Sequence, residues 1–456
     1  MTSVSTKLLG FVLLPVYTRY FTPEAVGTLY IYESIGKLLV VAISLYLDAA
    51  FVRFYFGVKS ENLRNMTSFF SSHFWFVLVW GGLTSALLCV SLEKFIPGLP
   101  PANYLVVPAL VLSQLFAQLV VMLTSVWAAD LNVKKIAVFT LGFSIIAFML
   151  TLYLIIFRQV NWEARVFALT LVGALQLSTI TWLSFKYGWL RFRFDIEWIV
   201  QSLKFSVPLI PNAVGVGVVM LSDKFILSYY GVLDQVGVYS IAAQFALILY
   251  VVNDSVTKIQ GSLAMSGMTA DVNQAKLKIA DFVNIYIPSM LIVFVFVSSL
   301  MPLIVTSFFD EQYVEAIEIF MILGWVYVLS GIYRVFTHVI AFHGATWIIS
   351  TGVIGQALVN VALNLVLIPY YGMYAAACST VISMCFYTYW LAWWSQRLEK
   401  IVFDYTRISR YFFVGLAGLF SLFVSGEFLA GELYSLIIRP VIFLLFVSAM
   451  YLLLPP

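Results

Sequence analysis

Residues 28–50 read TLYIYESIGKLLVVAISLYLDAA. This stretch is long and apolar enough to cross a bilayer as a helix, which takes roughly 20 mostly apolar residues. It also carries Glu33, Lys37 and Asp48. Charged groups at membrane depth are costly, and they usually mark a pathway or a binding site. The stretch therefore predicts a membrane-spanning helix that contributes polar groups to a function.

Comparable apolar stretches fill nearly all of the chain. Hydrophobic residues make up 62% of the 456 residues and charged residues 10%, and the mean hydropathy is +0.99; these values exclude a soluble globular protein. The runs are continuously apolar over about 20 residues, whereas a membrane β-barrel alternates over about 10. We therefore predict an all-α integral membrane protein with about 14 transmembrane helices. Their predicted ranges are 3–21, 28–50, 68–91, 103–127, 136–157, 164–185, 204–229, 236–257, 282–307, 316–337, 346–368, 372–394, 410–428 and 434–454.

Basic residues are divided unevenly between the two sides of this predicted bundle. If the loops after even-numbered spans are cytoplasmic, that side holds 16 of the 25 Lys and Arg residues and the opposite side holds 5. The positive-inside rule then predicts a multi-pass protein of the plasma (inner) membrane with both termini cytoplasmic. The first span is expected to be retained, because Pro15, Tyr17 and Arg19 stand where a cleavable signal would carry small residues.

An internal repeat and a polar linker divide the chain. Val26-Gly27 recurs 210 residues later as Val236-Gly237, each time after an acidic loop. The polar segment 186–203 separates the sixth predicted span from the seventh. We predict two pseudo-symmetric six-helix bundles followed by two extra helices. The corresponding ranges are 1–190 for the N-lobe, 191–400 for the C-lobe and 401–456 for the last two helices.

Charged residues within the spans form two groups. In the second span, Glu33, Lys37 and Asp48 fall within about 60° of one another on a continuous helix. Two interpretations stay open: a Glu33–Lys37 pair that stabilises the helix, or a stripe that lines a water-filled cavity, which the shared face favours. In the seventh span, Asp223 and Lys224 point about 100° apart, so we expect them to reach partners on other helices.

Uncharged polar residues at helical spacing are further candidates to line such a cavity. Their amides would either hydrogen-bond between helices, which is common in membranes, or bind sugar hydroxyls. These residues are Gln114, Gln118, Gln356, Asn360 and Asn364.

Signatures of enzymes, metals and cofactors are missing from the sequence. The three Cys and three His residues show no C-x-x-C or metal-ligand spacing, and there is no P-loop, nucleophile elbow or H-E-x-x-H motif. We therefore expect a protein that is not an enzyme, binds neither a metal nor a cofactor, and has no nucleic-acid partner. Its energy source would be an ion gradient, the membrane potential or the substrate gradient.

Four groups of residues along the chain carry a family pattern. They are PVYTRYFTPEAVG at 15–27, LDAAFVRF at 47–54, SDKFIL at 222–227 with VGVYSIA at 236–242, and NVALN at 360–364 with Ile368-Pro369, Tyr371-Gly372 and the alanines 375–377. In this order and spacing they resemble the polysaccharide biosynthesis/export family. These are the Wzx-type lipid-linked oligosaccharide flippases of the multidrug/oligosaccharidyl-lipid/polysaccharide exporter superfamily. The family's usual basic leader before the first span is not evident in this sequence.

The resemblance implies a MATE-like fold and a flippase that acts by alternating access. Its substrates would be undecaprenyl-diphosphate-linked oligosaccharide repeat units for O-antigen (lipopolysaccharide), capsule or exopolysaccharide synthesis. Implied partners are that lipid-linked oligosaccharide, membrane lipid, a polysaccharide polymerase and a chain-length regulator. Glu33, Asp48 and Asp223 are candidates for coupling to an ion gradient. The residues that match the family's cationic cavity are Lys37, Arg53, Lys224, Lys7 and Arg19.

Three other functions stay open. A multidrug or cation antiporter of the same fold would need acidic rather than basic cavity residues. A peptidoglycan lipid-precursor flippase would carry an arginine-rich first helix, which is not evident here. A membrane glycosyltransferase or ligase would have a long outer loop with catalytic residues, and no predicted loop is long enough.

Overall fold

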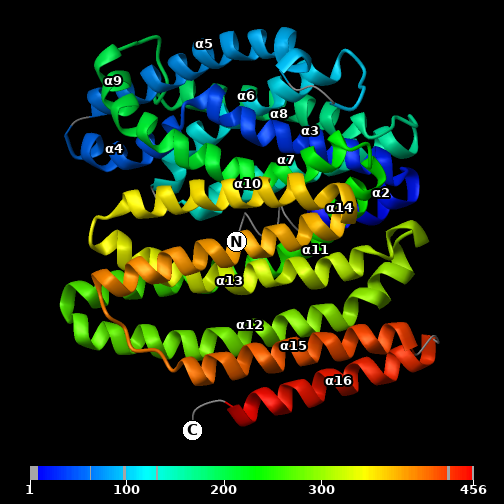
Figure 1. Ribbon diagram of the computed structural model, residues 1–456. Coiled ribbons are helices and arrows are strands. Elements are labelled where there is room, and N and C mark those ends of the chain that lie inside the picture. Colours follow the sequence, from blue (N-terminus) through cyan, green and yellow to red (C-terminus); the bar gives the residue numbers. More distant parts are fainter. Residues whose placement is uncertain (1–8, 62, 96–98, 130–131, 429–431, 454–456) are drawn as a thin grey trace. The chain divides into compact units, whose positions relative to one another are not determined.

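The computed structural model describes residues 9–61, 63–95, 99–129, 132–428 and 432–453, and within these ranges it contains helices and no strand (Figure 1). The helices are α2 (Leu14–Tyr20), α3 (Pro23–Ser44), α4 (Leu47–Glu61), α5 (Leu63–Phe95), α6 (Val106–Ala129), α7 (Val133–Ile156), α8 (Glu163–Lys186), α9 (Ile196–Ser206), α10 (Ile210–Tyr229), α11 (Leu233–Ala270), α12 (Val272–Phe308), α13 (Ala316–Phe342), α14 (Thr346–Leu398), α15 (Tyr405–Phe428) and α16 (Glu432–Leu453). Two short 3₁₀ segments, η1 (Val207–Leu209) and η2 (Glu311–Tyr313), precede α10 and α13.

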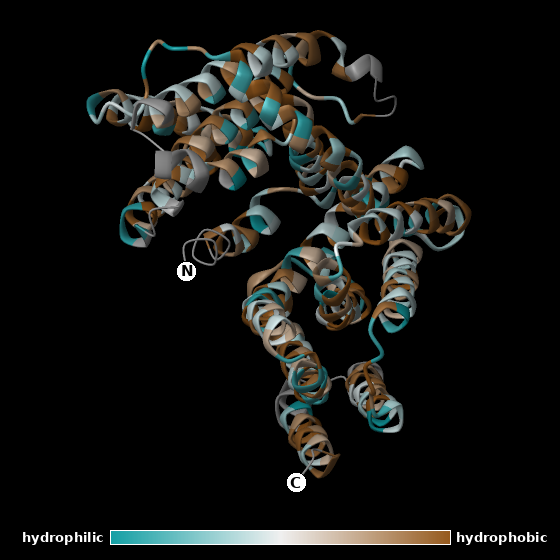
Figure 2. Ribbon diagram, turned by 90° about the vertical axis from the view of Figure 1, so that its left-hand side faces the viewer, coloured by the Kyte–Doolittle hydropathy of each residue, from teal (hydrophilic) through white to brown (hydrophobic). Residues whose placement is uncertain are grey.

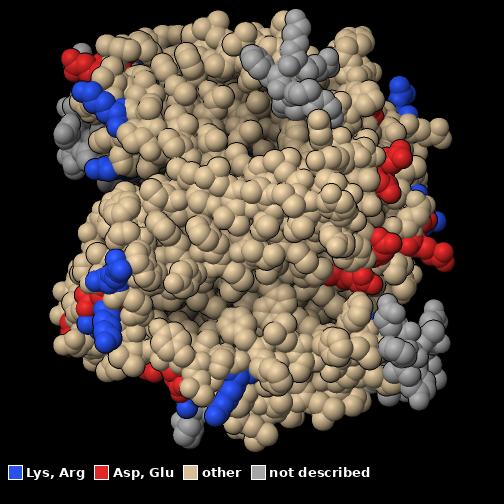
Figure 3. Space-filling view, in the orientation of Figure 1, with Lys and Arg blue, Asp and Glu red and all other residues tan. Residues whose placement is uncertain are grey.

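Eleven helices among the described residues are long and apolar enough to cross a membrane. Figure 2 shows hydrophobic residues along the helices, with hydrophilic residues mainly at helix ends and in connecting segments. In Figure 3 the charged side chains on view likewise lie toward helix ends. The all-helical membrane fold predicted from hydropathy is therefore confirmed.

The difference between eleven and about 14 predicted spans has three sources. The first predicted span corresponds to α2, and its residues 1–8 lie outside the described part of the chain. The eleventh and twelfth spans are both contained in α14. The last span is the shorter apolar helix Ile438–Leu453.

Helix α14 is two antiparallel limbs joined by a sharp turn at Gly372. The backbone of Gly372 has φ 53° and ψ −133°, a conformation that is essentially restricted to glycine. The limbs are tied together by hydrogen bonds, with Trp390 Nε1 donating to the carbonyl of Ile348 at 3.0 Å and Asn360 Nδ2 donating to Thr380 Oγ1 at 3.3 Å. Two spans therefore follow each other without an extended loop.

The second predicted span, 28–50, is wrong beyond residue 44, because α3 ends at Ser44. Leu45 and Tyr46 adopt φ values of 48° and 60°, and the Tyr46 N–H bonds the Ser44 Oγ at 3.2 Å instead of continuing the helical ladder. Serine side chains compete for backbone donors in this way. Asp48 therefore begins a different helix, α4, and the predicted stripe from Glu33 to Asp48 on one helix does not exist.

The seventh predicted span begins at a break between α9 and α10. Pro208 lies in η1, and Pro211 lies at the start of α10. Proline lacks a backbone N–H and is tolerated in the first turn of a helix, where that donor has no intrahelical partner. The two prolines therefore start α10 as a separate helix, which carries Lys224.

The chain forms two compact units, Met1–Gly237 and Val238–Pro456. In the first unit, α3 packs against α5, α6 and α10. In the second unit, α13 packs against α12 and α14, and α12 also contacts α15 and α16. The predicted boundary between residues 190 and 191 separates the two copies of the internal repeat. The two compact units are defined by contacts and not by the repeat, so this boundary stays a prediction.

The repeated glycines meet within the first unit. A Cβ atom on Gly27 would lie 2.3 Å from the carbonyl oxygen of Leu233, and one on Gly237 would lie 2.0 Å from the carbonyl oxygen of Pro23. Each glycine thus faces the carbonyl four residues before the other. This reciprocal contact is the pattern that a two-fold relation between the two copies produces, and it leaves no room for a larger residue at either position.

Candidate functional site

A charged cluster within the candidate membrane spans of the first unit is centred on Lys224. Its Nζ atom donates a hydrogen bond to Ser34 Oγ at 3.2 Å and lies 5.4 Å from the centre of the Tyr30 ring. Helices α10 and α3 lie close together at Gly217, where an added Cβ would lie 2.8 Å from Leu38 Cδ1. This close approach positions the groups around Lys224. A lysine on one helix is therefore aimed at the polar face of another.

The second cation of the cluster is Arg165, from the first turns of α8. Its Nε atom lies 3.6 Å from Glu33 Oε1, and the two side chains are 20% and 22% exposed. Trp162 stacks on Tyr32 at 5.0 Å between ring centres, which fixes the start of α8 against α3. Glu33 thus pairs with an arginine on another helix.

Three further groups surround these cations. Lys37 lies on α3 one turn after Glu33 and is exposed. Lys37 and the buried Asp223 both act electrostatically on Lys224. Tyr17 of α2 is 3% exposed and lies within electrostatic range of Arg165, yet its hydroxyl has no hydrogen-bond partner among the described residues.

We call these seven residues the cationic cluster: Tyr17, Glu33, Ser34, Lys37, Arg165, Asp223 and Lys224. Its three cations outnumber its two carboxylates, so the cluster carries a net positive charge. Among the ion pairs of the described residues, none includes Lys224. Its ammonium is bonded to a neutral hydroxyl, which leaves its charge able to pair with an anion.

Other residues predicted for the cationic cavity lie elsewhere. Arg53 is on α4, where its guanidinium stacks 4.3 Å from the centre of the Phe205 ring. Arg19 is exposed in the last turn of α2, and Asp48 is half-buried on α4. Lys7 lies outside the described residues. The structure therefore brings together Glu33, Lys37, Asp223 and Lys224 from the sequence-predicted set, and their role in binding stays a prediction.

Four of the five predicted amides are buried, and those of Gln356 and Asn360 bond across the two limbs of α14. Asn360 and Asn364 are fully buried between the two limbs of α14, and Asn364 Nδ2 donates to Asn360 Oδ1 at 3.2 Å. Gln356 is also buried and approaches Met384 Sδ at 3.9 Å. In the first unit, Gly36 makes room for Gln114 of α6, since a Cβ there would lie 3.0 Å from Gln114 Nε2. The neighbouring Gln118 is buried.

The profile of a family described as "Polysaccharide biosynthesis protein" matches residues 1–258, which is more than half of the chain. The chain belongs to the polysaccharide biosynthesis protein family. No curated protein sequence matches this family member.

Solved structures share the fold of this family member at low sequence identity. A structure titled lipid II flippase MurJ in an inward closed conformation has a TM-score of 0.75 and 16% identity, over 99% of this chain and 98% of that one. An inward-facing multidrug resistance MATE family transporter of the MOP superfamily has a TM-score of 0.61 and 13% identity, over 86% and 96%. The Vibrio cholerae MATE transporter VcmN in the bent form has a TM-score of 0.53 and 12% identity, over 87% and 99%. The predicted MATE-like fold is confirmed.

In this family member, sequence reasoning missed Arg165 and Tyr17. Arg165 stands at the outer end of the predicted span 164–185, and basic residues are common at span ends, so hydropathy does not mark it as a site residue. Its pairing with Glu33 depends on how α8 packs near α3. The spacing of residues along either helix does not predict that packing. Tyr17 falls in the family-like motif at 15–27, but nothing in the motif distinguishes it from Tyr20, which is exposed.

The second unit holds a further charged network that the sequence did not indicate. Arg334 Nη1 of α13 donates to Asp254 Oδ1 at 3.0 Å and to Thr257 Oγ1 at 2.8 Å, both on α11. Lys258 Nζ lies 2.6 Å from the other oxygen of Asp254. Both cations of this network share one carboxylate, in contrast to Lys224. Across the described residues, no group of three or more His, Cys, Asp or Glu is placed to hold a metal ion.

Proposed function

We propose that this protein is a flippase that translocates undecaprenyl-diphosphate-linked oligosaccharide repeat units across the plasma membrane for surface polysaccharide synthesis. The observation that carries the proposal is Lys224, a cation in a candidate membrane span that donates to a hydroxyl and lies 5.4 Å from the centre of an aromatic ring, within a cluster of net positive charge. Family membership and the shared fold of flippases and transporters support the same conclusion.

The chemistry of such a substrate sets what the protein must supply. Sugar hydroxyls and phosphates lose their water on entering a bilayer, at a cost of several kcal/mol for each unpaired polar group. In our proposal, Lys37, Arg165 and Lys224 replace the counter-ions of the diphosphate, and amide and hydroxyl side chains replace the water around the sugars. The lipid tail stays in the bilayer. A polysaccharide polymerase and a chain-length regulator would act on the translocated units.

We further propose that alternating access is coupled to an ion gradient through acidic residues. Glu33 is the strongest candidate, because its carboxylate pairs with Arg165 across two helices and is still 22% exposed. Protonation of Glu33 would weaken that pair and change how α3 and α8 are held together. Asp223 and Asp48 are the other candidates. If flipping by the Gln or Asn variant of each acid keeps its dependence on the gradient, this coupling is wrong.

Reconstituted liposomes provide the direct test of translocation. A fluorescent polyprenyl-diphosphate oligosaccharide is placed in the inner leaflet, and its appearance outside is followed by quenching. We expect wild-type protein to accelerate the movement and Lys224→Gln to slow it by at least tenfold. Lys186→Gln is the matched control, because Lys186 lies at the end of α8 against Trp182. Equal rates for wild type and Lys224→Gln would contradict the proposal.

A second candidate is translocation of a lipid-linked peptidoglycan precursor. The fold match to a lipid II flippase over nearly the whole of both chains favours it. The same liposomes loaded with labelled lipid II distinguish the two substrates, because both carry a diphosphate and differ in the attached sugars. A multidrug antiporter is disfavoured by the positive charge of the cluster, which would repel cationic drugs.

A further inference from the structure

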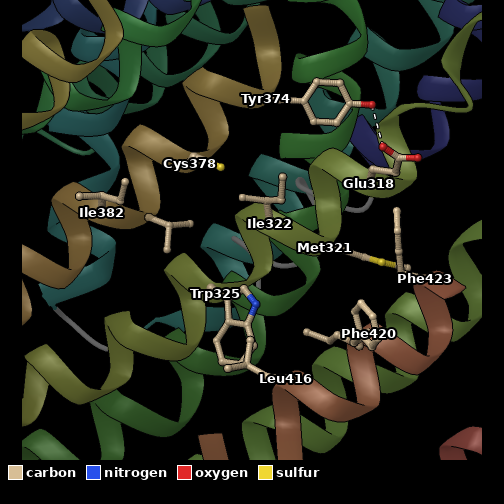
Figure 4. Close-up of a pocket in the computed structure, with 12 residues that line it drawn as sticks. Glu318, Met321, Ile322, Trp325, Tyr374, Cys378, Ile382, Leu416, Phe420 and Phe423 are labelled. Atoms are coloured by element: carbon tan, nitrogen blue, oxygen red, sulfur yellow. Dashed lines mark hydrogen bonds between the residues drawn. The ribbon is translucent and has the colours of Figure 1, made fainter. Parts of the chain in front are cut away.

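A groove within the second unit shares no residue with the cationic cluster and carries the opposite charge. It has a volume of about 550 Å³ and is formed by α13, α14 and α15 (Figure 4). Its walls are almost entirely apolar, with Trp325, Phe420 and Phe423 providing aromatic surface. This volume is within the range of small-molecule binding sites, about 300–1,000 Å³.

One end of the groove carries a carboxylate. The hydroxyl of Tyr374 donates a hydrogen bond to Glu318 Oε2 at 2.7 Å, which orients the carboxylate beside the apolar walls (Figure 4). A neutral hydroxyl leaves the negative charge in place. Among the ion pairs of the described residues, none includes Glu318. Glu315, three residues earlier, adds a second negative charge at the start of α13.

Charge and shape together restrict what can occupy the groove. An anionic lipid diphosphate would be repelled by Glu318 and Glu315. A neutral hydrocarbon chain would pack on the walls but would gain nothing from the carboxylate. An occupant with a positive charge and a bulky apolar body would pair with Glu318 and pack that body on the apolar surface of Trp325 and Phe420.

We infer that the groove between α13, α14 and α15 is a binding site for a hydrophobic monovalent organic cation, with Glu318 as its counter-ion. The inference is independent of the proposed translocation activity, since it uses no residue of the cationic cluster. It assigns a ligand class to a site that lies wholly within the second unit.

Tetraphenylphosphonium is the probe for this site, with the protein held in lipid nanodiscs. We expect saturable binding of the radiolabelled cation that is at least tenfold weaker in Glu318→Gln. The glutamine carbonyl still accepts the Tyr374 hydrogen bond, so this variant removes the charge and keeps the local structure. Glu311→Gln is the matched control, because Glu311 is exposed and does not line the groove, and the affinity of this variant should stay within twofold of wild type.

A second variant and a second probe separate pairing from simple partition. Trp325→Leu should weaken cation binding several-fold while leaving Glu318 in place. Radiolabelled tetraphenylborate, which has the same size and the opposite charge and is measured in a separate sample, should show no saturable binding. Equal affinity for the cation in wild type and Glu318→Gln would overturn the inference, as would saturable binding of tetraphenylborate or cation uptake that never saturates. Gel filtration and circular dichroism confirm that each variant is folded.

Discussion

At the scale of single residues, Lys224 and Arg165 differ in how their charges are balanced. Arg165 lies 3.6 Å from Glu33, whereas Lys224 is bonded to Ser34 and lies over Tyr30. A cation in an ion pair gives up more of its attraction for a ligand than Lys224 does, because the carboxylates of Glu33 and Asp223 act on Lys224 electrostatically and form no ion pair with it among the described residues. The two residues therefore contribute unequally to anion binding, with Lys224 as the stronger contributor.

This difference predicts opposite effects of two substitutions on anion binding. Glu33→Gln should tighten binding of inorganic pyrophosphate, because Arg165 loses its competing carboxylate. Lys224→Gln should weaken it about 10- to 100-fold, since a charge-assisted hydrogen bond contributes about 1.5–3 kcal/mol and a tenfold change is about 1.4 kcal/mol. Calorimetry on the purified protein measures both effects.

The control for these measurements is Glu197→Gln, an exposed carboxylate in the first turn of α9. Its affinity for pyrophosphate should equal that of wild type. Weaker binding in Glu33→Gln would show that Glu33 orients the cations rather than competing with the anion.

A second prediction concerns the fit of Gly27 against Leu233. Gly27→Ala would place a Cβ 2.3 Å from a backbone carbonyl, and a helix start would have to move. We expect a loss of about 1–3 kcal/mol in the free energy of unfolding, the usual cost of overpacking. Gly82→Ala is the control, because nothing lies within 4 Å of its added Cβ. Thermal unfolding in detergent that gives the same midpoint for both variants would refute this contact.

At the scale of helices, sequence patterns predicted where most elements lie but not where α3 ends. Hydropathy is continuous across residues 28–50, so it could not locate the change of direction at Leu45 and Tyr46. That change depends on the Ser44 side chain bonding the Tyr46 N–H. The break before α10, by contrast, falls at Pro208 and Pro211, because proline limits helix geometry directly.

The ends of three helices meet at Glu399, just after α14. Its carboxylate pairs with Lys276 of α12, and its other oxygen lies 3.4 Å from His343 Nε2 at the end of α13. The hydrogen bond from Lys276, together with the charges of Lys276 and His343, lowers the pKa of Glu399. A carboxyl with a lowered folded-state pKa contributes stability above its unfolded value, about 4.3 for Glu, and that contribution is lost as the pH falls through the folded value.

Acid should therefore weaken the junction of α12, α13 and α14. We expect wild-type protein in detergent to lose thermal stability as the pH is lowered below about 4.3, and Glu399→Gln to lose less over the same interval. Glu311→Gln, an exposed residue outside this junction, should follow the wild-type profile. If the profile of Glu399→Gln also matches wild type, the junction does not contribute to acid sensitivity.

At the scale of the whole molecule, the fold class followed from composition, and the site did not. Each apolar stretch can be recognised from its own residues. The number of helices and the fold class can therefore be estimated without knowing any contact between helices. The cationic cluster draws on α2, α3, α8 and α10, and its pairing of Glu33 with Arg165 depends on packing between distant segments. Sequence therefore supplied Glu33 with Lys37 and Asp223 with Lys224 as two separate groups, and it missed Arg165.

The predicted orientation of the chain is open to a labelling test. With Cys89, Cys378 and Cys385 replaced by serine, a single cysteine is introduced at Lys135 or at Glu311, both exposed. The positive-inside rule predicts that a membrane-impermeant maleimide added to intact cells modifies Glu311→Cys and not Lys135→Cys. Labelling of both should occur after the membrane is opened. The reverse pattern in intact cells would place both termini outside.

The reciprocal contact of Gly27 and Gly237 has a consequence for how this protein can evolve. Each glycine is confined by the main chain of the other copy of the repeat, and a main-chain atom cannot be exchanged by mutation. A larger side chain at one position could be accommodated only if the opposite helix start shifted, which would disturb the second glycine as well. Positions 27 and 237 should therefore both stay glycine across natural homologues, even where the other residues of the two predicted repeat copies diverge.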